Sequence, residues 1–90
     1  MTGVIDNAQE NRFELQASGA TAIAAYVRDG DTITFTHTVV PEAMQGHGLG
    51  SQLIAAALNS ARAQGLSVVP QCEFVAAYID AHPDYADLVA

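Results

Sequence analysis

A glycine loop that leads directly into a helix constrains this chain more than any other feature. Residues 41–50 read Pro-Glu-Ala-Met-Gln-Gly-His-Gly-Leu-Gly, with glycine at the alternate positions 46, 48 and 50. Residues 51–64 contain no glycine or proline and repeat their apolar side chains at helical spacing. The first turn of a helix leaves backbone N–H groups without partners and carries the positive end of the helix dipole. A loop of this kind is therefore suited to binding a phosphate group.

Three strands are expected before the loop. Alternating polarity predicts strands over residues 12–17, 21–27 and 32–39, and an Asp-Gly pair at 29–30 predicts the hairpin between the last two. In the strand 32–39, threonines take one face, and the other face is expected to carry Ile33, Phe35, His37 and Val39. Ser18 and Gly19 are typical of a turn.

A second strand–helix pair is expected after the loop helix. Gly65 stands where a left-handed helix cap is common, and residues 67–69 predict a short strand parallel to the third one. Residues 74–79 predict a second helix, which ends before Pro83. We therefore expect an α+β fold in which an antiparallel three-stranded meander is followed by a β-α-β-α half.

Length and composition bound the class of protein. Ninety residues, half of them apolar, predict a single domain over residues 11–90. Residues 1–10 are mostly polar and show no periodicity, which predicts a flexible N-terminus. No apolar run approaches the roughly 18 residues of a membrane span, and no signal peptide is apparent. With only one cysteine, a cytoplasmic location is the simplest expectation.

The charge balance excludes one class of partner. The formal net charge is −7, with three arginines and no lysine, so the chain cannot present a basic patch to nucleic acid. A phosphate ligand must then be held mainly by backbone groups. The same negative field favours a cationic substrate such as an amine.

The spacing of the glycines distinguishes this loop from two well-known phosphate-binding loops. Gly-x-Gly-x-Gly is neither the dinucleotide-binding Gly-x-Gly-x-x-Gly nor a lysine-containing P-loop, and a purely structural turn is the alternative. Gln45-x-x-Gly48-x-Gly50 resembles the Arg/Gln-x-x-Gly-x-Gly/Ala signature of the GNAT superfamily of N-acetyltransferases. Residues 12–88 are similar to small single-domain GNAT-like proteins. The matching motifs are Thr36-His37-Thr38-x-Val40-Pro41, the glycine loop, Val68-Val69-Pro70-x-Cys72-x-Phe74-Val75, Tyr78-Ile79, His82-Pro83, Tyr85 and Leu88.

The resemblance implies an acetyl-CoA-dependent N-acetyltransferase that acts on an amine. It implies that loop amides bind the cofactor pyrophosphate, while main-chain groups at the strand end hold the pantetheine and polarise the thioester. A small molecule or a protein would supply the amine. The cofactor-binding residues implied in this way are Val39, Val40, Gln45, Gly46, His47, Gly48, Leu49, Gly50 and Ser51.

Three side chains are candidates for the chemistry. The resemblance places Tyr78 near the cofactor sulfur as the acid for the leaving thiolate, although its spacing also suits a core aromatic. Cys72 either accepts the acetyl group transiently or fills space as a small buried residue. His37 serves as general base or is simply packed, and Glu42 is an alternative base. The histidines and the cysteine lack metal-ligand spacing, so no metal site is expected.

One departure from the family pattern bears on the acceptor. Full-length GNAT enzymes carry two helices between their first two strands, and Ser18-Gly19 leaves no room for them. The threonine-rich face is then either exposed or covered by a second subunit or the substrate protein, so both a monomer and a homodimer are compatible with the sequence. A non-catalytic acyl-CoA-binding or protein-interaction module is the alternative function.

Overall fold

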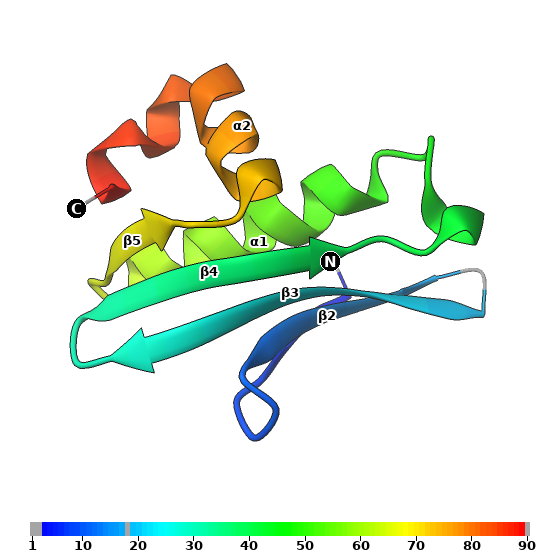
Figure 1. Cartoon of the computed structure of the whole chain (residues 1–90), viewed down its shortest axis with the longest axis horizontal. Coiled ribbons are helices and arrows are strands. Elements are labelled where there is room, and N and C mark those ends of the chain that lie inside the picture. The colour runs from blue at the N-terminus through cyan, green and yellow to red at the C-terminus, as the bar shows by residue number, and fades with distance from the viewer. Residues whose placement is uncertain (1–2, 18, 90) are drawn as a thin grey trace.

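The computed structural model describes residues 3–17 and 19–89, which form one five-stranded sheet with two α-helices and two short 3₁₀ helices (Figure 1). In chain order the elements are β1 (Val4–Asn7), β2 (Arg12–Ala17), β3 (Ala20–Asp29), β4 (Thr32–Val39), η1 (Glu42–Met44), α1 (Leu49–Ala63), β5 (Ser67–Pro70), α2 (Glu73–Ala81) and η2 (Pro83–Leu88). The strands lie in sequence order. β1 to β4 are antiparallel, and β5 is parallel to β4. The α+β architecture expected from the sequence is confirmed.

Two glycines with positive φ mark a hairpin turn and the end of a helix. Gly30 in the β3–β4 hairpin has φ 59°, and Gly65 after α1 has φ 70°, both in the left-handed region that glycine tolerates. The predicted turn at Ser18-Gly19 falls partly outside the described residues. None of the helices described here is long and apolar enough to cross a membrane.

The hydrophobic core lies between the sheet and α1. α1 covers one face of the sheet, and α2 and η2 stand beside β5 (Figure 1). Alternate residues of β2 and β3 point into this core, as expected for strands with one buried face. The largest fully buried side chains are Phe35, Met44, Leu53, Ile54, Leu58, Val68 and Val75. No helix covers the opposite face of the sheet within the described residues.

Part of the N-terminal segment forms a strand, contrary to the expectation from the sequence. Residues 1–10 were expected to be flexible, and the meander to have three strands, but β1 pairs with β2 in antiparallel register from Val4 opposite Leu15 to Asn7 opposite Arg12. Val4 packs against the core, whereas Ile5 on the other face is 62% exposed. The segment is too short and too polar for its alternation to be apparent in the sequence alone.

A β-bulge at Thr36 corrects the predicted faces of β4. Tyr26 lies opposite Phe35, and Ala25 lies opposite His37, so no residue of β3 lies directly opposite Thr36. Because of this extra residue, the alternation of faces along β4 is reversed after Thr36. The prediction that His37 shares the face of Phe35 is therefore wrong. His37 and Val39 are exposed on the face that carries no helix, and Thr38 turns to the other side.

The buried side chain of Tyr26 on β3 forms a hydrogen bond with the N-terminal strand β1. The Tyr26 hydroxyl donates a hydrogen bond to the Asp6 carboxylate at 2.6 Å, and Tyr26 is only 6% exposed. Burial, and then this hydrogen bond, raises the pKa of Tyr26 to about 12 from an ordinary 10.0. Between these values the folded protein keeps a proton that the unfolded chain releases, so stability falls as the pH rises from about 10 through about 12.

Replacing Tyr26 with phenylalanine tests this link. At neutral pH the free energy of unfolding is expected to fall by about 1 to 2 kcal/mol, because a hydrogen bond to a charged group is lost. Above pH 10 the difference from the unmodified protein is expected to shrink, because phenylalanine has no proton to lose. Urea denaturation at pH 8 and pH 11 measures both quantities. An unchanged difference at the two pH values would contradict the assignment.

Candidate functional site

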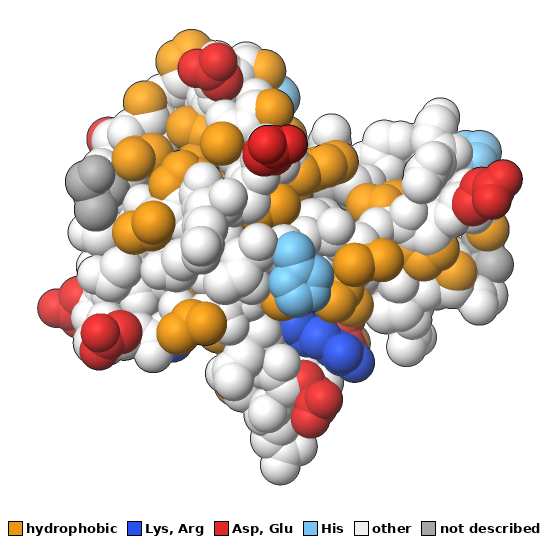
Figure 2. Space-filling view, viewed as in Figure 1, with side chains coloured by type: hydrophobic (Ala, Val, Ile, Leu, Met, Phe, Trp, Pro, Cys, Tyr) orange, Lys and Arg blue, Asp and Glu red, His pale blue; other side chains and the backbone are white. Residues whose placement is uncertain are grey.

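A pocket opens where β5 separates from β4. β5 pairs with β4 only from Thr32 to Phe35, and the Phe35 carbonyl then accepts a hydrogen bond from the Cys72 N–H at 2.8 Å. β4 continues beyond this point to Val39. In the space-filling view the surface is indented between the part formed by α2, at the top, and the part formed by the β4–α1 loop, at the right (Figure 2). The pocket has a volume of about 540 Å³ and is lined by Thr38, Val39, Val40, Met44, Gln45, Gly46, Gly48, Leu49, Gly50, Ser51 and Phe74.

The backbone N–H groups of residues 46–51 have no hydrogen-bond acceptor in the part of the chain that the structure describes. The first N–H of α1 with a carbonyl partner belongs to Gln52, which donates to Gly48 at 3.1 Å. Gly48 is the N-cap residue, and no side chain caps the helix. Most of these residues line the pocket, so a row of unsatisfied donors and the positive end of α1 meet there.

Two physical reasons favour glycine in the loop, one shared by Gly46 and Gly48 and the other specific to Gly50. Gly46 has φ 81° and Gly48 has φ 71°, a backbone conformation that other residues rarely adopt, although a Cβ at either position would meet open space. Gly50 has ordinary helical geometry but no room. A Cβ there would lie 2.8 Å from Cζ of Phe74 and 3.3 Å from Cγ2 of Val40.

Gln45 departs from its expected role. Its backbone N–H was expected to bind a phosphate, but it donates to the Glu42 carbonyl at 3.2 Å and is already satisfied within η1. Its side-chain Nε2 instead donates to the Val40 carbonyl at 3.0 Å. Gln45 lines the pocket, and its side-chain hydrogen bond joins the start of the glycine loop to the residue that follows β4.

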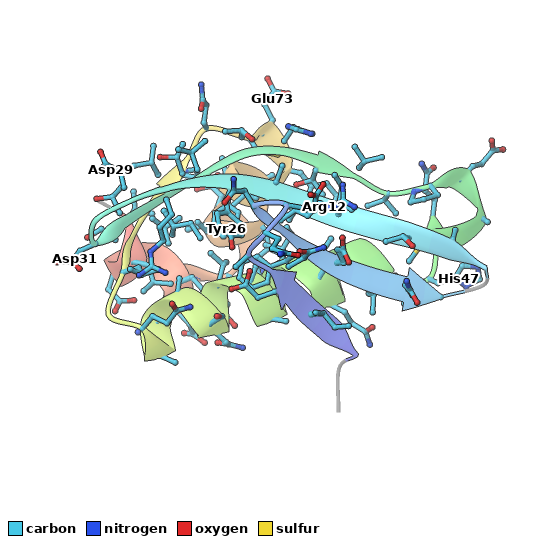
Figure 3. The ribbon with its side chains drawn as sticks, turned by 90° about the horizontal axis from the view of Figure 1, so that it is seen from below. Arg12, Tyr26, Asp29, Asp31, His47 and Glu73 are labelled. Atoms are coloured by element: carbon cyan, nitrogen blue, oxygen red, sulfur yellow. The ribbon has the colours of Figure 1, made fainter. Side chains whose placement is uncertain are left out.

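Among the residues that the structure describes, no arginine lines the pocket. Arg12 is paired with Glu14 at 2.6 Å, Arg28 bonds Gln64, and Arg62 is paired with Asp87 at 2.9 Å. The uncharged lining is consistent with the expectation that backbone groups must hold a phosphate. His47 lies in the loop, at the opposite end of the molecule from the acidic hairpin with Asp29 and Asp31 (Figure 3).

Tyr78 is not one of the residues that line the pocket. It follows Phe74 by one turn of α2, and its ring stacks on His82 with centroids 4.0 Å apart. Burial, and then the neighbouring Tyr85, raises the pKa of Tyr78 above its ordinary value. His82 lies at the end of α2, where its Nδ1 is 2.9 Å from the Tyr78 carbonyl oxygen.

Cys72 and the His37 side chain lie on opposite faces of β4. Cys72 is the N-cap residue of α2, is 9% exposed, and its Sγ lies 3.3 Å from Oγ1 of Thr38, which lines the pocket. His37 is exposed on the other face of β4, with its Nδ1 3.3 Å from Oγ1 of Thr36. The structure thus brings Cys72 close to the pocket wall and turns His37 away from it. Glu42 is exposed in η1. The described residues contain no group of three or more His, Cys, Asp or Glu that could hold a metal ion.

Three residues of the pocket wall were missed from the sequence. Met44 is fully buried beneath the loop, and Thr38 reaches the pocket because of the bulge. The sequence carries no signal for either. Phe74 could have been found, because it forms with Tyr78 a second helical stripe beside the core stripe of Val75 and Ile79.

Comparison with known proteins agrees with this geometry. A family model described as GCN5-related N-acetyl-transferase matches residues 12–88. The solution NMR structure of a GCN5-like protein from Staphylococcus aureus resembles the fold with a TM-score of 0.75 and 25% sequence identity, over 100% of this chain and 91% of that chain. The family resemblance inferred from the sequence is confirmed.

Proposed function

The chain belongs to the GCN5-related N-acetyltransferase family, and on this basis we propose that it transfers the acetyl group of acetyl-CoA to an amine. The family supports acetyl transfer as the general activity. The cofactor and the acceptor are the specific content of the proposal. The net charge of −7 favours an acceptor that carries positive charge, such as a polyamine or a lysine-bearing peptide.

The unpartnered backbone N–H groups of residues 46–51 carry this proposal. They converge with the positive end of α1 on a pocket whose lining, among the described residues, includes no carboxylate and no arginine. A diphosphate satisfies such donors without lysine, in the manner of anions bound at helix N-termini. The pocket continues along Thr38, Val39 and Val40, where the free edge of β4 can hold a pantetheine arm.

The chemistry requires one proton donor and one proton acceptor. Acetyl-CoA supplies an activated thioester, and the amine attacks its carbonyl carbon as the carbon–sulfur bond breaks. Tyr78 donates its proton to the departing sulfur as the general acid, since a tyrosine hydroxyl is protonated at neutral pH. The proton that the amine loses passes to solvent, because His37, the base expected from the sequence, faces away from the pocket on the other side of β4. In the alternative route, the Cys72 sulfur would attack the thioester and CoA would leave as its thiol. The amine would then attack the acetyl carbonyl on Cys72, which would form the amide and restore the Cys72 thiol.

A non-catalytic acyl-CoA-binding module is the second candidate, because Tyr78, His37 and Cys72 are all absent from the pocket lining. Both functions require CoA binding. Only the enzyme releases CoA thiol at a rate that depends on added amine.

A thiol-release assay separates these possibilities. Acetyl-CoA is incubated with the protein and with spermidine, a lysine-rich peptide or a neutral aromatic amine, and free thiol is followed with a chromogenic disulfide. The proposal predicts release that rises with amine concentration and is faster with the cationic amines. Thermal stabilisation by CoA without any amine-dependent release would instead favour the binding module.

A further inference from the structure

Thr38 forms the end of the pocket that lies nearest to the paired part of β4 and β5. The pairing of these strands stops at Phe35 opposite Pro70, where the Cys72 N–H also donates to the Phe35 carbonyl at 2.8 Å. β4 continues past this point without β5 beside it (Figure 1). Along β4, Thr38 is the first of the described residues to line the pocket after Phe35. The pocket between the two separating segments therefore begins at Thr38.

The Thr38 side chain contacts the segment on the other side of this separation. Its Oγ1 lies 3.3 Å from Sγ of Cys72, the residue that precedes α2. Cys72 is only 9% exposed and is not among the residues that line the pocket, so Thr38 lies between the Cys72 sulfur and the pocket. The contact depends on the bulge at Thr36, because a regular strand would place Thr38 on the opposite face of the sheet. We call this contact between Thr38 and Cys72 the end wall.

The position of the end wall determines which part of a bound acyl-CoA reaches it. The proposed function places the diphosphate at residues 46–51 and the pantetheine arm along residues 38–40, which line the same pocket. The acyl group is attached to the end of the pantetheine arm that is distant from the diphosphate. It is therefore the part of the ligand that meets Thr38, and a longer acyl chain would extend into the space that the Thr38 hydroxyl and methyl groups occupy.

We propose that Thr38, supported by Cys72 behind it, is a specificity-determining residue that favours acetyl over longer acyl groups. This inference rests on the proposed function and adds to it the length of the acyl chain. One methylene group too many in a closely fitting pocket commonly weakens recognition by about 10- to 200-fold. Because the role is steric, the size of the side chain at position 38 matters and its hydroxyl group does not.

Two variants with side chains of different size test this proposal. Dissociation constants for CoA, acetyl-CoA and butyryl-CoA are measured by calorimetric titration without an amine. The unmodified protein is expected to bind butyryl-CoA at least about tenfold more weakly than acetyl-CoA. Thr38→Ala removes the hydroxyl and methyl groups from the end wall, so this difference is expected to fall to about twofold or less. Thr38→Val is the matched control, because valine keeps the shape of threonine, and it is expected to discriminate as the unmodified protein does.

The affinity for CoA, which carries no acyl group, is expected to be the same in the unmodified protein and in both variants. Equal binding of acetyl-CoA and butyryl-CoA by the unmodified protein would overturn the proposal, and so would full discrimination by Thr38→Ala. Loss of discrimination in Thr38→Val would overturn it as well, because the hydroxyl group would then be the deciding feature. Weaker binding of CoA itself by Thr38→Ala would indicate a general loss of pocket structure and would also contradict the proposal. Failure of the unmodified protein to bind CoA would instead refute the proposed function, and this inference with it.

Discussion

Replacing Gly50 with leucine is expected to abolish measurable acyl-CoA binding while the protein stays folded. A Cβ at this position would lie 2.8 Å from Cζ of Phe74 and 3.3 Å from Cγ2 of Val40, and both residues line the pocket. Phe74 is 41% exposed and can turn outward, so the cost in folding stability is expected to be about 1 to 3 kcal/mol. The leucine side chain then occupies the space beside the free N–H groups. We expect at least a roughly 100-fold loss in affinity, equivalent to about 2.7 kcal/mol.

The control for this variant is Ala63→Leu, which places the same side chain on an exposed position in the last turn of α1. Calorimetric titration with acetyl-CoA measures the affinity, and urea denaturation checks that both variants are folded. Ala63→Leu is expected to bind normally. If a folded Gly50→Leu variant binds acetyl-CoA as tightly as the control, the cofactor does not occupy this pocket.

Replacing Tyr78 with phenylalanine is expected to lower kcat by roughly 100-fold, the lower range for loss of a general acid. The affinity for acetyl-CoA is expected to change little, because the ring remains stacked on His82 and the hydroxyl does not line the pocket. An effect on kcat without an effect on binding is the signature of an interaction made only in the transition state.

Tyr85→Phe is the matched control for Tyr78→Phe. The Tyr85 ring lies 5.9 Å from that of Tyr78, and its hydroxyl donates to Asn59 on α1 at 3.1 Å, away from the pocket wall. Its kcat is expected to fall less than about threefold, because only a surface hydrogen bond is lost. Equal rates for the two variants would exclude Tyr78 as the acid and direct attention to the Cys72 route.

The sequence predicted the elements around the site well because local signals specify them. Glycines at 30 and 65 mark turns with positive φ, and the apolar stripe of α1 is long enough to be unambiguous. The glycine loop also predicted the pocket, since the same residues that lack side chains leave the N–H groups uncovered.

Features that depend on pairing between strands could not be predicted. The four residues of β1 form a strand because they pair with β2, and their own sequence shows no clear alternation of polar and apolar residues. The bulge at Thr36 leaves no trace in a strand where every second residue is threonine, yet it reverses the faces of His37 and Thr38. Register is a property of two strands together, so a single strand's alternation cannot reveal an inserted residue.

The main claim is that main-chain amides at the start of α1 hold the diphosphate of the cofactor. Titration of ¹⁵N-labelled protein with acetyl-CoA, followed by amide chemical shifts, tests it most directly. The largest shifts are expected at residues 46–51, with smaller ones at residues 38–40. Saturating acetyl-CoA that leaves the amides of 46–51 unmoved, or that shifts only residues on the open face of the sheet, would contradict it.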